Sequence, residues 1–188
     1  MTYGYESRRQ KDLIGRLRYN IGTMVTLNVN TKKSLSALYT PGFDNRNYEI
    51  TSSNAEPQLV FVKGTIFRLQ GSYRYEQKVN APLYGGQESV SNSLIMETKY
   101  NVFQNSSITG RFTYNAILYT DKASNNKANS TVSYTMLDGL LPGKNFLWSF
   151  DLTKRLLNNV ELNFQYEGRK PAETNPIHTG RASLRALF

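Results

Sequence analysis

Few side chains in this chain have the type and spacing that catalysis or metal binding requires. His178 is the only histidine and there is no cysteine, so no second imidazole or thiolate can complete a metal site. Glu161 and Glu167 are better interpreted as members of structural ion pairs than as a general acid and base. His178 itself is expected to be a polar surface residue. We therefore expect no enzyme, no catalytic residue, no metal and no cofactor.

The other candidates are charged residues that mostly occur singly on the polar face of alternating segments. The chain has 23 Lys and Arg against 14 Asp and Glu, but the basic residues are scattered, so nucleic acid is not an expected partner. An open lumen lined by these charges would favour anions, whereas a closed or plugged lumen would contain ladders of ion pairs, and we favour the second alternative. The candidate lumen-facing residues are Arg68, Arg74, Glu97, Arg111, Glu161, Arg181 and Arg185.

These charges belong to segments in which apolar and polar residues alternate, a pattern that predicts β-strands. The clearest case runs from Val160 to Arg169, and the segments from Ile108 to Thr120 and from Phe67 to Tyr75 repeat it. We expect an all-β antiparallel meander of about eight to ten strands in one domain, residues 1–188. The other alternating segments are Leu17 to Val29, Leu94 to Val102, Val132 to Met136 and Phe146 to Leu152.

Strand length and aromatic content favour a transmembrane β-barrel. Several segments approach the about 9 to 11 residues that a tilted membrane strand needs, and no apolar run is long enough for a membrane helix. Most of the 13 Tyr and 9 Phe share a face with aliphatic residues, as in the aromatic girdles of such barrels. The polar start, Met1 to Gln10, has no signal peptide, so we expect a mature form or the C-terminal piece of a longer protein.

The final strand places Gly180, Leu184, Ala186 and Phe188 on one face. It resembles the C-terminal targeting strand of outer-membrane barrels, which ends in an aromatic residue and is read by the barrel-assembly machinery. The resemblance implies that these four residues form an assembly signal, and that the partners are outer-membrane lipid and this machinery. In the family an aromatic or large apolar residue usually stands two places before the end and a glycine five places before it, where this chain has Ala186 and Ser183.

A longer stretch also looks like the C-terminal end of large outer-membrane barrels from the Bacteroidetes. The resemblance covers the C-terminal third of the chain well and the part from Pro57 onward loosely. It implies an outer-membrane location and a larger barrel, with upstream strands or other subunits as further partners. The segments that carry it are Met136 to Asn145, Leu157 to Val160, Tyr166 to Lys170 and His178 to Arg181.

One topological check conflicts with this strand assignment. If Phe188 ends in the periplasm, the segment 170–177 lies outside and the tight turn at 158–159 inside, as short periplasmic turns require. Counting back through a strand at Val132 to Met136 then puts the tight turn at 104–106 outside and the long segment 80–88 inside. Either a strand between Lys127 and Phe146 is missed or wrongly assigned, or the rule of short periplasmic turns fails locally, and we favour an error in the strand count.

Two functions fit these patterns. The first is an outer-membrane β-barrel that acts as a pore, a transporter wall or a surface anchor. The alternative is a soluble barrel or clam that holds a hydrophobic ligand, with its apolar face turned inward. Alternation is the same for both, because it does not say which face is enclosed.

Overall fold

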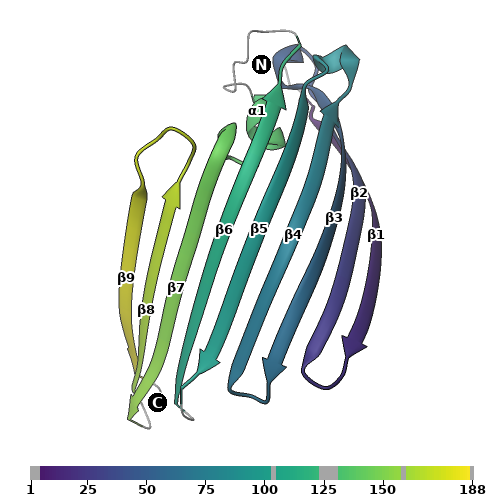
Figure 1. Cartoon of the computed structure of the whole chain (residues 1–188). Helices are drawn as coiled ribbons and strands as arrows, with labels where there is room; N and C mark the ends of the chain where they lie inside the picture. The colour runs from purple at the N-terminus through teal and green to yellow at the C-terminus, as the bar shows by residue number, and fades with distance from the viewer. Residues whose placement is uncertain (1–4, 103–104, 123–130, 158–159, 187–188) are drawn as a thin grey trace.

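A computed structural model describes residues 5–102, 105–122, 131–157 and 160–186. Nine antiparallel strands form a single sheet in meander order from β1 to β9, which confirms the all-β antiparallel fold class. The sheet is curved but open, with β1 and β9 at its two edges (Figure 1). The strands are β1 (Ser7–Ile21), β2 (Val25–Tyr39), β3 (Tyr48–Lys63), β4 (Phe67–Asn80), β5 (Glu88–Asn101), β6 (Ser106–Thr120), β7 (Gly143–Leu157), β8 (Val160–Lys170) and β9 (Ile177–Ala186).

The connections differ in length at the two ends of the sheet (Figure 1). At the turn end, the strands of four hairpins follow each other closely: β1 and β2, β3 and β4, β5 and β6, β7 and β8. At the loop end, longer connections contain η1 (Asp44–Arg46), η2 (Pro82–Tyr84) and the helix α1 (Thr131–Met136). The chain enters β1 at the loop end and leaves β9 at the turn end.

The prediction of a strand from Val132 to Met136 is wrong, because this segment forms α1. Val132 and Met136 pack against Ile50 of β3 and Ile117 of β6. Their spacing of four positions suits one face of a helix as well as one face of a strand, so alternation could not separate the two. Without that strand, all the short turns lie at one end of the sheet, which resolves the topological conflict. Among the described residues, no helix is long and apolar enough to cross a membrane.

The alternation fails to predict two other features of the strands. The segment from Leu17 to Val29 is two strands joined by a turn, because β1 ends at Ile21, which pairs with Val25 of β2. Gly22 opens the turn with φ +71°, a conformation that glycine adopts without strain. The alternation also does not predict β3, because polar residues such as Ser52 and Ser53 lie on both faces of its loop-end half.

The sheet has two distinct faces, which we name by the position of α1. The inner face carries α1. A small hydrophobic core between the helix and the sheet includes Ile50, Ile117 and Tyr119 from the strands beneath it. Two polar contacts reinforce this packing: the hydroxyl groups of Tyr119 and Ser133 are 2.6 Å apart, and Lys78 Nζ lies 2.7 Å from the Asp138 carboxylate. The outer face is the opposite side of the sheet.

Candidate functional site

The burial of the two faces is inverted relative to a soluble β-domain. The buried side chains of β2 to β6 all lie on the inner face, and many of them are polar. Ser72 and Ser93 are 4% and 5% exposed, whereas Leu94 on the outer face is 47% exposed. A soluble sheet turns its apolar face toward the core. Here the polar face is enclosed and the apolar face is open.

The exposed apolar residues form a band on the outer face, nearer to the turn end than to the loop end. On β4 the band runs from Phe67 to Tyr75 and ends where Gln77 follows on the same face. This length matches the about 9 to 11 residues of a tilted membrane strand. One row of the outer face crosses the whole sheet through directly opposed residues, from near the turn end of β1 to the loop end of β9: Tyr19, Leu27, Leu59, Gly71, Met96, Phe112, Trp148, Gly168 and His178.

Aromatic residues mark both margins of this band. Toward the turn end, Phe67 lies between Phe61 and Tyr100, with ring centroids 6.3 and 6.4 Å apart. Toward the loop end, Tyr114 and Phe146 are 5.2 Å apart. Aromatic rings at two levels on one apolar face are typical of the interfacial girdles of membrane barrels.

An aromatic cluster on the outer face joins β7, β8 and β9. Trp148 lies directly opposite Gly168 and covers it so closely that a Cβ at Gly168 would be 2.1 Å from the indole ring. His178 stacks against Tyr166 with an interplanar angle of 10°, and its Nδ1 is 2.8 Å from the Tyr166 hydroxyl. His178 is exposed, as predicted, and it belongs to this cluster.

All seven residues predicted to face a lumen lie on the inner face. The structure brings only some of them to partners: Arg74 pairs with Glu56 of β3 at 2.7 Å, and Glu161 approaches Arg155 at 3.9 Å. Arg68 donates a hydrogen bond to Gln70. Glu97 lies directly opposite Arg111, and Glu161 directly opposite Arg185. Within the described part of the chain, no ion pair within 4.0 Å involves Arg111, Arg181 or Arg185.

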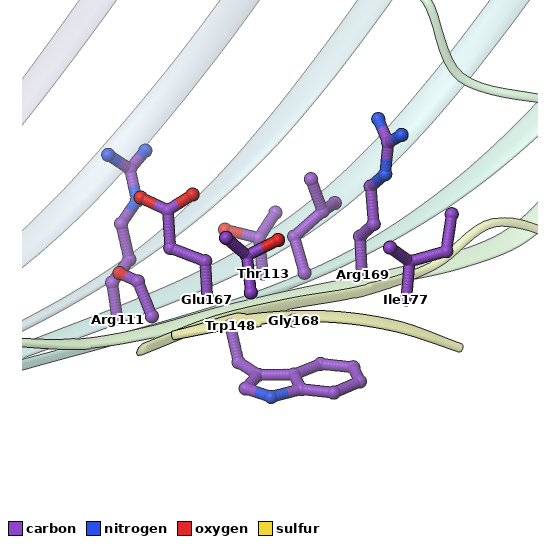
Figure 2. A pocket seen from close by; sticks show the side chains of 10 residues that line it. Arg111, Thr113, Trp148, Glu167, Gly168, Arg169 and Ile177 are labelled. Carbon is purple, nitrogen blue, oxygen red and sulfur yellow. The ribbon is translucent and has the colours of Figure 1, made fainter. Parts of the chain in front are cut away.

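A hollow of about 500 Å³ lies against the inner face across β6, β7, β8 and β9. Figure 2 shows Arg111, Glu167 and Arg169 projecting into it, while Trp148 points away on the opposite side of the sheet. Arg169 lines this hollow, although the sequence analysis does not predict it to face a lumen. Its position two residues after Glu167 already placed it on the same face.

The predicted assembly signal lies at the far edge of the sheet. Gly180, Leu184 and Ala186 are on the outer face of β9, continuous with the apolar band. Leu184 is 68% exposed. Phe188 lies outside the described residues.

Buried asparagines hold the connections at the loop end. Asn80 is fully buried and donates hydrogen bonds to the Tyr84 carbonyl and to Gln87, each at 2.8 Å. Its own side-chain oxygen accepts from the Glu49 backbone N–H at 3.1 Å. Asn145 plays the same part between Leu141 and Ala172. These amides replace backbone hydrogen bonds that the strands no longer supply at their ends.

Replacing Asn80 with alanine is expected to lower the free energy of unfolding by about 1 to 3 kcal/mol, because it leaves buried backbone and side-chain groups without partners. Urea unfolding would measure the loss. Asn30→Ala is the matched control, because the Asn30 amide makes no side-chain hydrogen bond within the described residues. Equal stability of the two variants would contradict the bracing role of Asn80.

No protein-family model matches the chain, and no curated protein matches it either. Among the described residues, no group of three or more His, Cys, Asp or Glu side chains could hold a metal ion.

Proposed function

We propose that this chain forms part of the wall of an outer-membrane β-barrel, with the apolar band against lipid and the inner face toward the lumen. One observation carries the proposal: the polar face is enclosed while the apolar face is open. Exposed apolar patches on this scale mark contact with a membrane or a partner. The alternative, a soluble clam around a hydrophobic ligand, requires the opposite curvature.

The ends of the sheet support an orientation within the membrane. Outer-membrane barrels have short turns on the periplasmic side and longer loops outside. The turn end is therefore the periplasmic side. The connections that contain η1, η2 and α1 then lie on the extracellular side of the membrane. In this orientation β9 ends in the periplasm, where the assembly machinery would meet Gly180, Leu184 and Ala186.

Among the roles of such a wall, the inner face favours a narrowed lumen over an open pore. α1 packs onto this face near its extracellular end. Lys78 of β4 pairs with Asp138, two residues after the end of the helix. Arg74 and Glu56 form an ion pair at mid-height. The inner face thus combines charge pairs with a helix that occupies part of the cross-section, as in a plugged transporter wall.

The single tryptophan provides a direct test, because Trp148 lies on the outer face, within the apolar band. Reconstituted into vesicles of phosphatidylcholine with brominated acyl chains, the protein is expected to lose most of its tryptophan fluorescence, while aqueous iodide quenches little. A soluble clam would stay in the supernatant and would not be quenched by the lipid.

The control moves the indole to the other face of the same strand. In the double variant W148F/S149W, the new indole lies on the inner face, beside Arg111 and Glu167. Quenching by brominated lipid should fall sharply in this variant, and quenching by iodide should rise. Stronger lipid quenching of the inner-face indole would overturn the proposal.

A further inference from the structure

At both edges of the sheet, the backbone N–H and C=O groups that point away from the sheet have no neighbouring strand to pair with. β1 and β9 are the terminal members of the strand order, and every residue in each of them is exposed. β1 has 15 residues, and no proline or bulge protects it. Such an edge is a template for another strand.

The apolar band continues to both edges. Leu17 and Tyr19 carry it on β1, where they are 66% and 65% exposed, and Leu184 carries it on β9. If the band faces lipid, as proposed above, both edges lie in hydrocarbon, where an unpaired N–H or C=O costs several kcal/mol. Each edge must then pair with a further strand.

The directions of the two edges limit how the sheet can close. β1 and β9 both run from the loop end to the turn end (Figure 1). Direct pairing between them would therefore be parallel. A second copy in the same membrane orientation would meet this chain along the same parallel seam. Antiparallel closure requires an odd number of additional strands, which makes the total even, as in bacterial outer-membrane barrels.

The charges on the inner face also disfavour direct pairing of the edges. Arg16 and Arg18 lie on the inner face of β1 toward the turn end, and Arg181 and Arg185 lie on the inner face of β9. None of the four has an ion pair within 4.0 Å among the residues that the structure describes. Pairing β1 with β9 would bring like charges together at similar depth, which destabilises neighbouring strands.

We propose that an odd number of additional amphipathic strands lies between β1 and β9, that the strands next to both edges run antiparallel to them, and that these strands place acidic residues opposite the edge arginines. This inference rests on the proposed membrane wall. The occupant of each edge is therefore a strand with an outward apolar face and inward carboxylates. A second copy of this chain fits neither the direction nor the charge.

Cysteine pairs test the closure directly, because the chain has no cysteine of its own. In the membrane-assembled protein, Leu17→Cys is combined in turn with Ala182→Cys, Leu184→Cys and Ala186→Cys, which covers several registers. We expect no disulfide within or between chains. The control pair, Leu17→Cys with Val29→Cys, joins directly opposed residues and should form a disulfide readily. A cross-linked monomer would establish nine-strand closure, and a cross-linked dimer a second copy; either result would overturn the proposal.

Amide hydrogen exchange on the same membrane-assembled protein shows whether the edges are occupied. In an unpaired edge strand, alternate amides point away from the sheet and exchange rapidly. We expect all amides of β1 within the apolar band to be as protected as those of β4, and backbone Hα–Hα contacts to show antiparallel pairing. Rapid exchange at alternate positions would overturn the proposal. Loss of lipid quenching at Trp148 would instead reject the membrane wall, so the two failures are distinguishable.

A charge reversal tests whether the strand that pairs with β1 carries acidic residues. Arg16→Glu should lower the temperature at which the assembled protein loses its compact mobility on gels, because the new carboxylate would face acidic partners. Asn28→Glu places the same charge on β2, directly opposite Arg18 and Gln58, away from the edge, and should not lower it. An equal or smaller effect of Arg16→Glu would overturn the acidic partner.

Discussion

Phe112→Arg is expected to shift the equilibrium of membrane insertion against the folded state by about 2 to 4 kcal/mol, a factor of roughly thirty to several hundred. Phe112 lies in the apolar band near the middle of β6, directly opposite Met96 and Trp148. A guanidinium at this position would face the hydrocarbon interior without a partner. The fraction of protein that refolds into phosphatidylcholine vesicles from urea would measure the effect.

The control introduces the same arginine at the neighbouring residue. Thr113 is the next residue along β6, and it faces the inner hollow with Arg111. Thr113→Arg should change insertion little, because its charge enters a polar and hydrated space. If Thr113→Arg impaired insertion more than Phe112→Arg, the inner face would be the lipid-facing one.

Gly168→Ala is expected to destabilise the folded protein by about 1 to 3 kcal/mol, the usual cost of inserting an extra carbon into a packed contact. The new Cβ would be 2.1 Å from the Trp148 ring, which would have to leave its position over β8. The aromatic cluster with His178 and Tyr166 would then separate. Urea unfolding and the emission maximum of Trp148 would report both effects.

Gly71→Ala is the matched control. Gly71 lies on β4 in the same row of directly opposed outer-face residues, but a Cβ there would meet no atom within 4 Å. Alanine should therefore be neutral or slightly stabilising, because it restricts the unfolded chain more than glycine does. Equal destabilisation at both positions would mean that the loss of a glycine, rather than contact with the indole, determines the effect.

Much of the strand pattern could be predicted from the sequence. The faces of Phe67 to Tyr75 and of Val160 to Arg169 were correct, because a half-exposed strand must alternate wherever one side is apolar. β3 could not be predicted, since its loop-end half extends beyond the apolar band and has polar residues such as Ser52 and Ser53 on both faces. α1 was misassigned because four-residue spacing fits both a helix and a strand.

The candidate site was predicted in part. The seven charged residues do share one face, because alternation alone assigns them to it. Their partners depend on the register between strands distant in sequence, so the pairing of Arg74 with Glu56 could not be predicted. The contact of Trp148 with Gly168 also depends on register, since it exists only if β7 and β8 pair as they do.

The sequence by itself determined that this protein has a two-faced sheet, because the identity of alternate residues is a property of each strand alone. Only the tertiary structure decided which face is enclosed, where α1 lies, and that β1 and β9 are open edges running in the same direction. The curvature depends on how neighbouring strands pair and twist, and the direction of the edge strands depends on how many strands the sheet contains. No single strand contains that information.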